Sequence, residues 1–586
     1  MNPPVLSRSI SILALLTLMN LALPGFGQGG AENVLLVVNE ESSSSKLLAN
    51  HYVHLRNIPR SHVVHLSGIA KREATDEADF IKTILQPVMK TIRERKLSNC
   101  IDYIVYSSDF PTMVNIPKFQ QRLFERWKLE KKNSPLDQRT YAPTASLTSL
   151  TYFANQVLDD DPSFMLLDAN RYMRAKTDVS RYLPTRSFHS SDSWGKNGQV
   201  VDAASSGRSY FISTMLAVTC DEGISERAAL DFLNNSVSAD GTPPKGTVFF
   251  TDNAGARSRA RKANFDDAIA QLDALKIKTK KILSAVTPAN EDVAGFVAGA
   301  PNMDLAKSQC RFSPGSICEN LTSIGAKFTS KSQIKCTEFL RYGAAGSSGC
   351  VVEPYAIQAK FPHPMIQVHY ARGCTMGEAF YQSIHGPFQI LIVGDPLCRP
   401  YGVSPILADI GKSDGLNTIQ GSVVWNIEVR NEVQIGKLNL FVDGSKVGER
   451  PFNSKLTFNS KTMSDGYHEV RVVAVADNAI ETNSSKTIHL LVENERRRLS
   501  INSNQKQYDV SGQVTVDVTS NFDGQVTLYC QDLALGSLSR RKGSISFDAA
   551  MPGRGPIELV AISKFDGKII QSAPLEVYIS GTILDN

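Results

Sequence analysis

The residues best suited to chemistry are concentrated between positions 339 and 402, where histidines, cysteines and acids surround a Gly-rich segment. Cys374 precedes a predicted helix, and a helix N-terminus lowers the pKa of a thiol. His369 lies five residues upstream of it, and Asp395 follows a predicted strand. A thiol, an imidazole and an orienting carboxylate are the groups of a cysteine hydrolase. Cys374, His369 and Asp395 are therefore the first catalytic candidates.

Two further side chains of this stretch, His363 and Glu353, are candidates for binding. With His369 they could also hold a metal ion for hydrolysis, although the sequence has no paired C-x-x-C motif and we predict no cofactor and no resident metal. Structural roles remain open for all of these residues. Each His could occupy a core position, Asp395 could close a turn, and Cys374 could form a disulfide.

The helix and strand that must position these groups can be predicted from short sequence patterns. Thr375 and Glu378 have the spacing of a capping box, which predicts a helix starting there. The apolar block 388–393, bounded by turn residues, predicts a buried strand after that helix. A helix followed by an apolar strand is typical of an open α/β sheet, where ligands bind beyond the carboxyl ends of strands.

The same alternation recurs through the first two thirds of the chain. Apolar blocks at 33–38, 62–66 and 101–106, separated by helical patterns, predict parallel strands. The pattern restarts at 247–250, which favours two related α/β subdomains, residues 31–240 with a long insertion and residues 241–402. Within the insertion, Trp194 lies on a polar loop and could line a ligand site; the alternative is an aromatic tucked under a surface loop.

From residue 403 the apolar residues alternate with a period of two. Asp443–Gly444 and Asp465–Gly466 supply the turns between such segments, and the pattern repeats after Arg496. We predict two immunoglobulin-like β-sandwich modules, 403–495 and 496–586. The expected fold class is therefore α/β followed by all-β.

The composition and the N-terminal segment indicate the partners and the cellular location to expect. The chain has 586 residues, 42% of them hydrophobic and 21% charged, and a net charge of +5, so nucleic acid is not an expected partner. Residues 1–27 read as a signal peptide, and no later apolar run predicts a membrane span. We expect an exported protein that is not integral to a membrane. Its nine cysteines would then favour disulfides, with at least one left unpaired.

Several motifs carry a resemblance that covers about residues 30–402. They are IDYIVYSSDFP, SADGTPPKGTVFF, SPGSICENLTSIGAKF, LRYGAAGSSGCVVEPYAIQAKFPHP, HYARGCTMGEAFYQS and LIVGDPLCRPY. These blocks resemble an uncharacterised family of secreted bacterial proteins. More distantly, GEAF followed by an apolar strand and GDP resembles gingipain-type cysteine peptidases, which implies a caspase-like fold of two α/β subdomains.

The gingipain resemblance implies a His at one strand end and a Cys at the next. In the alignment with the second α/β half, VAGFVAG at 293–299 has no His, and Ser323 stands near the Cys position. A Ser without its base is a poor nucleophile. The leading hypothesis is thus a secreted scaffold that lacks the catalytic pair and binds an extracellular protein, peptide or glycan. The alternatives are a cysteine hydrolase using Cys374 and His369, and a metal-assisted hydrolase.

Overall fold

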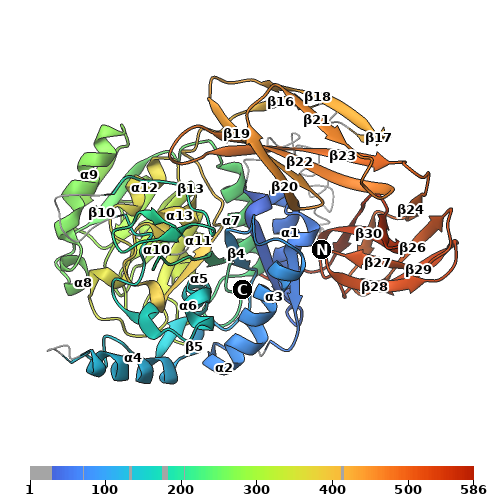
Figure 1. Cartoon of the computed structure of the whole chain (residues 1–586). Helices are drawn as coiled ribbons and strands as arrows, with labels where there is room; N and C mark the ends of the chain where they lie inside the picture. The colour runs from blue at the N-terminus through green and yellow to red at the C-terminus, as the bar shows by residue number, and fades with distance from the viewer. Residues whose placement is uncertain are drawn as a thin grey trace, which may run out of the picture.

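The computed structural model describes residues 30–69, 72–130, 135–174, 183–202, 205–410 and 415–585. They form an α/β region followed by two β-sandwich modules that pack beside each other against one end of it (Figure 1). The predicted signal peptide, 1–27, lies outside these residues. Within the described ranges no helix is both long and apolar enough to cross a membrane.

One ten-stranded sheet organises the α/β region, in the order β11-β10-β12-β13-β14-β15-β9-β4-β1-β2. Among the neighbouring strands that pair over several residues, β14 and β15 run antiparallel and every other pair is parallel. The strands are β1 (Val34–Asn39), β2 (Val63–Leu66), β4 (Tyr103–Tyr106), β9 (Ile212–Met215), β10 (Thr247–Thr251), β11 (Thr279–Ile282), β12 (Asp292–Ala298), β13 (Arg311–Asn320), β14 (Gly346–Cys350) and β15 (Ile390–Gly394).

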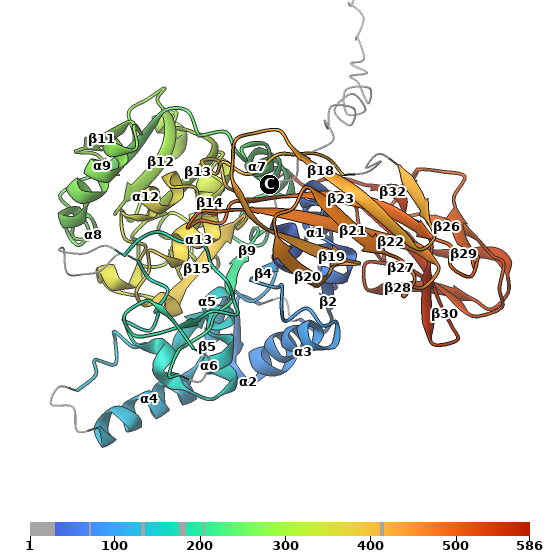
Figure 2. The same cartoon turned by 45° about the horizontal axis from the view of Figure 1, so that its top comes forward.

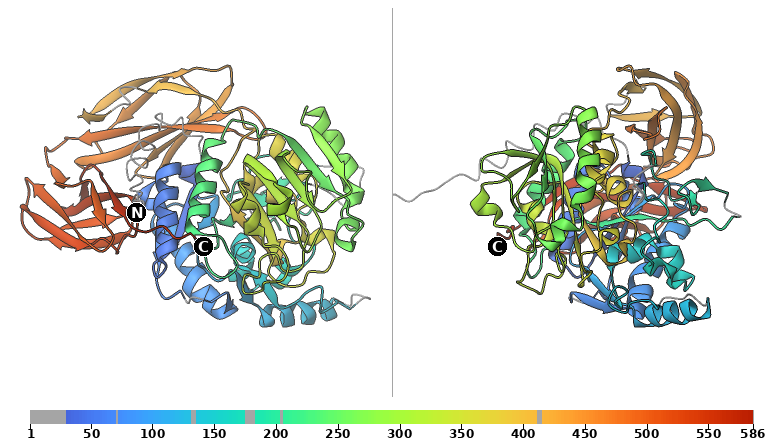
Figure 3. Two further views of the ribbon diagram at one scale, coloured as in Figure 1. Left: turned by 180° about the vertical axis from the view of Figure 1, so that it is seen from behind. Right: turned by 90° about the vertical axis from the view of Figure 1, so that its left-hand side faces the viewer.

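Helices cover both faces of this sheet, as expected for parallel strands. Helices α1, α7 and α11 contact one another along one face, and α9, α12 and α13 along the other (Figure 3). The helices are α1 (Ser43–Arg56), α2 (Glu77–Asp79), α3 (Gln86–Glu94), α4 (Pro117–Leu129), α5 (Leu147–Tyr152), α6 (Ala154–Leu158), α7 (Glu226–Ser238), α8 (Ala256–Arg259), α9 (Phe265–Ala274), α10 (Leu305–Ser308), α11 (Cys336–Arg341), α12 (Ile366–Ala371) and α13 (Met376–Tyr381). Short strands β3 (Ala74–Asp76), β5 (Met113–Asn115), β6 (Thr144–Ser146), β7 (Ser193–Trp194) and β8 (Val200–Val201) lie outside the main sheet.

Local sequence signals account for much of this order. The Thr375 hydroxyl accepts from the Glu378 amide at 3.1 Å and the Glu378 carboxylate accepts from the Thr375 amide at 2.8 Å, so the predicted capping box is confirmed at the start of α13. The apolar block after it forms β15, as predicted. Strand β9, at the end of the irregular middle section, has no counterpart among the predicted strands, although it lies near the centre of the sheet.

The two C-terminal modules are mainly antiparallel sandwiches, as the period of two predicts, each with its own apolar core. Each also contains one parallel pair, β17 with β23 in the first and β25 with β32 in the second. A single pairing of Gly466 with Gln571 joins one sheet of the first module to one of the second. The first contains β16 (Leu407–Ile410), β17 (Leu416–Ile419), β18 (Ser422–Val429), β19 (Ile435–Val442), β20 (Ser445–Pro451), β21 (Lys455–Asn459), β22 (Gly466–Ala476) and β23 (Asn483–Val492). The second contains β24 (Leu499–Asn502), β25 (Gln507–Asp509), β26 (Gln513–Ser520), β27 (Val526–Cys530), β28 (Leu533–Leu538), β29 (Lys542–Asp548), β30 (Gly555–Phe565), β31 (Lys568–Gln571) and β32 (Leu575–Ser580).

Both modules are bonded to the α/β region (Figure 2). The His62 ring, just before β2, bonds through Nε2 to the Gly444 carbonyl of the first module at 2.8 Å. Arg554 of the second module donates from Nη1 to Glu226 of α7 at 2.9 Å, and both side chains are largely buried. Because a buried ion pair is costly to break, these contacts fix the modules in place.

The cysteines do not form the disulfides that the sequence favours. All nine lie in described ranges, and each is a free thiol; eight are buried and Cys220 is exposed. The eight buried thiols therefore behave as small apolar side chains of the core.

Candidate functional site

Cys374 and His369 lie in the packed interior between α12 and α13. The Cys374 thiol accepts a hydrogen bond from Gln382 Nε2 at 3.2 Å, while His369 Nδ1 bonds to the Thr185 hydroxyl at 2.7 Å. Both side chains are fully buried, and burial raises the pKa of Cys374 well above 9.0 and lowers that of His369 to about 3. No hydrogen bond joins the two side chains in the described chain, so the geometry gives a neutral thiol without a base.

Asp395 follows β15, as predicted, but its carboxylate is occupied. Tyr52 donates its hydroxyl to Oδ1 at 2.8 Å, and Arg56 Nε donates to Oδ2 at 3.0 Å. Arg56 also pairs with Asp240, beyond the end of α7. Asp395 is fully buried in this network, which ties α1 to the end of β15. The structure therefore does not bring Asp395 together with His369 and Cys374 in an open cleft.

The three predicted binding residues are dispersed. Glu353 is exposed and accepts from the Tyr355 amide at 2.9 Å, while His363 is buried and its Nδ1 accepts from the Met365 amide at 3.2 Å. Trp194 is fully buried, with the Arg174 guanidinium 4.8 Å from its ring centroid. The aromatic on the predicted polar loop is thus tucked inside rather than presented to solvent.

The carboxyl ends of β4, β9 and β13 meet at one edge of the sheet. The Glu222 amide, after β9, donates to the Phe328 carbonyl, after β13, at 3.1 Å. Ser323 lies on this side, 6% exposed, and its hydroxyl accepts from Arg257 Nη2 at 2.9 Å. The exposed Cys220 also follows β9, next to the polar residues that follow β4.

Cys220 has an acidic neighbourhood. Ser108 Oγ lies 3.0 Å from Thr219 Oγ1, and the Thr219 hydroxyl donates to Asp109 at 2.8 Å. Although the Cys220 side chain reaches solvent, the protein packed around its thiol, and then the charges of Asp109 and Asp221, raise the pKa of this thiol to about 12. The thiol is thus protonated at neutral pH, and the charged groups that act on it most strongly in the described chain are carboxylates.

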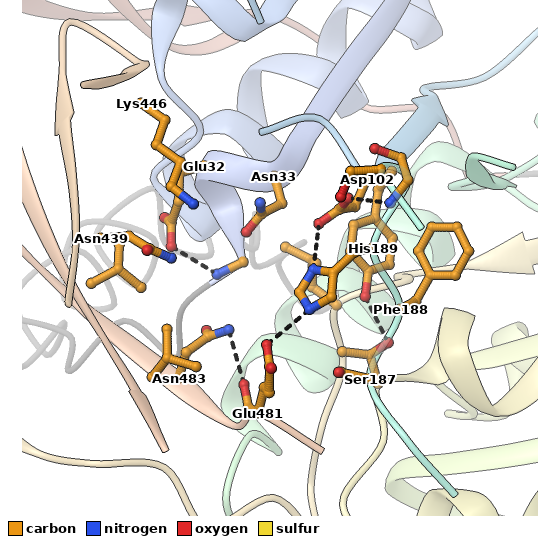
Figure 4. A pocket seen from close by; sticks show the side chains of 18 of the residues that line it. Glu32, Asn33, Asp102, Ser187, Phe188, His189, Asn439, Lys446, Glu481 and Asn483 are labelled. Carbon is orange, nitrogen blue, oxygen red and sulfur yellow. Dashed lines mark hydrogen bonds and ion pairs between the residues drawn. The ribbon is translucent and has the colours of Figure 1, made fainter. Parts of the chain in front are cut away.

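A pocket of about 200 Å³ lies on the opposite side, where β1 and β4 begin and the first sandwich module packs against them. Figure 4 shows His189 at its centre, between Asp102 of the α/β region and Glu481 of the first module. His189 Nε2 bonds to Glu481 Oε2 at 2.8 Å, and Nδ1 lies 3.8 Å from Asp102 Oδ2. The pocket is thus built from both domains.

The loop that carries His189 is held at both ends. The Ser190 amide donates to Asp102 at 2.7 Å, and the Ser187 amide donates to the Ala479 carbonyl at 2.9 Å. Burial alone would lower the pKa of His189, but the facing carboxylate of Asp102 and the hydrogen-bonded carboxylate of Glu481 raise it to about 10. The ring is therefore an imidazolium at neutral pH, a charged bridge between the two domains rather than a general base.

Most charged side chains around the pocket are paired with one another. Lys446 lies 2.7 Å from Glu449, Lys437 lies 3.7 Å from Glu481, and Arg399 lies 3.4 Å from the Glu378 carboxylate. In the described part of the chain, no group of three or more His, Cys, Asp or Glu side chains is arranged to hold a metal ion. The paired charges give the pocket a polar wall of donors and acceptors, which can recognise a polar ligand.

The sequence contains only part of the signal for this site. The polar loop 186–198 contains Phe188, His189 and Trp194, but the sequence alone does not indicate that His189, rather than Trp194, lies at the pocket. Cys220 lies two residues after the largely apolar segment 212–218, which has the composition of a buried strand and could have identified β9. The partner Glu481 is 292 residues from His189 and has no sequence signature.

No protein-family model matches the chain, and no curated protein matches its sequence. Similar solved structures include the fibronectin(III)-like modules of Clostridium thermocellum CbhA, with 13% identity over 29% of this chain and 92% of that one and a TM-score of 0.13. Another is dimeric latent PorU from Porphyromonas gingivalis, with 12% identity over 31% of this chain and 20% of PorU and a TM-score of 0.14. TM-scores this low describe local likeness, and no function follows from them.

Proposed function

We propose that this chain is an exported, non-catalytic binding protein, related to the secreted bacterial family and, more distantly, to the gingipain-type peptidases that its sequence resembles. The α/β region would then consist of two related caspase-like subdomains. Its ligand site is the pocket at His189, and its ligands are extracellular peptides, proteins or glycans. The first sandwich module completes the pocket wall.

The observation that carries the proposal is the environment of Cys220. Gingipain-type enzymes place a His and a Cys at successive strand ends, and β4 and β9 are neighbouring parallel strands. Cys220 follows β9, but Ser107, Ser108 and Asp109 follow β4. Carboxylates favour the neutral thiol, whereas a cysteine nucleophile needs a thiolate. The chain thus has an exposed thiol at a strand end other than the one that the alignment assigns to Ser323, and among the described residues the charges that act on this thiol are carboxylates.

Activity-directed probes test this proposal. Purified protein is treated at pH 7 with a thiol-directed probe and a serine-directed probe, and adducts are located by peptide mass spectrometry. We expect no stoichiometric adduct at Cys220 or Ser323. The Cys220→Ser variant should give the same labelling pattern as the native protein. Rapid labelling of native Cys220 that a competing peptide substrate suppresses would instead establish a cysteine hydrolase.

A further inference from the structure

The pocket at His189 contains a buried carboxylate that its surroundings do not satisfy. Glu32 is 0% exposed, although it lines the pocket. Its Oε1 accepts from the Gly30 amide at 3.2 Å, but Oε2 has no hydrogen-bond partner among the described residues. An uncompensated buried charge is costly, so an orphaned oxygen on a pocket wall indicates a missing partner.

Two more orphaned oxygens line the same pocket. Oδ1 of Asn439 and Oδ1 of Asn483 are buried without partners in the described part of the chain. Figure 4 shows both amides on the same side of the pocket as the Glu32 carboxylate. These three oxygens are acceptors, so a ligand group that fits them must be a donor. The Nε of Arg399, a donor, is the further side-chain atom of the pocket lining that has no partner in the described part of the chain.

The balance of charge favours a cationic donor. Each basic side chain on the pocket wall already faces a carboxylate, whereas Glu32 forms no ion pair within the described ranges. The charge of Arg471 reaches Glu32, but its guanidinium is bonded to Glu469 and to the Asn57 carbonyl. Glu32 is therefore the one lining carboxylate left for a ligand in this part of the structure.

We propose that this pocket binds a primary ammonium group, carried by a small amine or by the amino end of a larger solute. An ammonium has three donors and no acceptor, which matches three orphaned acceptors and one uncompensated negative charge. A volume of about 200 Å³ is below the roughly 300 Å³ of drug-sized pockets, so it takes a compact group. This inference rests on the proposed binding function and specifies the chemistry that the site recognises.

The ammonium site can be tested by equilibrium dialysis of the mature protein at pH 7. The two ligands compared are ethanolamine and its neutral isostere, ethylene glycol. Ethanolamine is expected to bind with a Kd on the order of 1 mM, and ethylene glycol about tenfold more weakly or not at all. Glu32→Gln keeps the shape and removes the charge, so it should lose at least about tenfold in ethanolamine affinity. Asn439→Leu should weaken binding less, by roughly threefold to tenfold.

Glu94→Gln is the matched control, because it is the same substitution at an exposed carboxylate that is paired with Lys90 and does not line the pocket. It should stay within about twofold of native affinity. Three results would overturn the inference. They are equal binding of the amine and the diol, full ethanolamine binding by a Glu32→Gln variant that melts like the native protein, and no ethanolamine binding at all. None of these results would make the protein an enzyme, whereas an adduct at Cys220 would remove the proposed function and leave the amine site untouched.

Discussion

His189 and Glu481, 292 residues apart, bond at 2.8 Å and join the α/β region to the first sandwich module. Because Asp102 faces the other ring nitrogen, the imidazolium lies between two carboxylates. This charged hydrogen bond is one of several contacts between the α/β region and the first module, and it depends on the proton that the imidazolium carries.

That proton makes the interface sensitive to alkaline pH. The pKa of His189 is raised from 6.5 to about 10, so its stabilising contribution is complete below pH 6.5, declines above it and is lost as pH rises through 10. Since 36% of the side chain is exposed, the effect should be about 1 kcal/mol or less. Melting curves between pH 6 and pH 10 should show native protein and His189→Gln converging as pH rises.

His54→Gln is the control for this comparison, since His54 is exposed on α1. Its melting temperature should follow that of the native protein at every pH. A difference between native protein and His189→Gln that grows with pH would contradict the assignment of an imidazolium bridge.

Arg56 should be essential for stability. Replacing it with Leu leaves Asp240 and Asp395 buried without their cation, at an expected cost of about 3–5 kcal/mol in the free energy of unfolding. Arg72→Leu removes the Arg72–Asp79 pair, in which both side chains are about half exposed, and should cost less than about 1 kcal/mol. Urea unfolding measures both, and similar costs for the two variants would argue against a buried network.

Cys220 should alkylate slowly at neutral pH. With a pKa of about 12, its rate with iodoacetamide should rise roughly tenfold per pH unit without levelling off below pH 10. Asp221→Asn removes one of the carboxylates that raise this pKa and should accelerate the reaction at pH 8. Cys374 serves as the internal control, because a buried thiol should react only after unfolding. A rate that levels off near pH 7 would mean an activated thiolate.

Gly394, at the end of β15, should not tolerate a side chain. Its φ is +125°, and an added Cβ would collide with the Ala345 carbonyl oxygen. Gly567 also has a positive φ, +73°, but a Cβ there meets no described atom within 4 Å. We expect Gly567→Ala to cost about 1–2 kcal/mol and Gly394→Ala at least about 3 kcal/mol, as measured by urea unfolding. Equal costs would mean that the antiparallel pairing of β14 with β15 can relax.

Local chemistry in the sequence determined the elements of this protein. The Thr375–Glu378 capping box, the apolar blocks of the parallel strands and the Asp-Gly turns of the sandwiches depend on residues a few positions apart, so they can be read directly. The order α/β followed by two sandwiches follows from them. The sequence analysis did not predict strand β9, because its apolar segment lies in an irregular region without flanking helical periodicity.

Tertiary structure alone decided which side chains share a site. Asp395 pairs with Arg56 across 339 residues and His189 meets Glu481 across 292, and no spacing rule connects such pairs. Burial also reversed the expected chemistry, since the helix N-terminus that would activate the Cys374 thiol lies in an interior where desolvation keeps the thiol neutral. The sequence specifies which groups are present, but their protonation and partners depend on how the ten-stranded sheet and the sandwich modules exclude water around them.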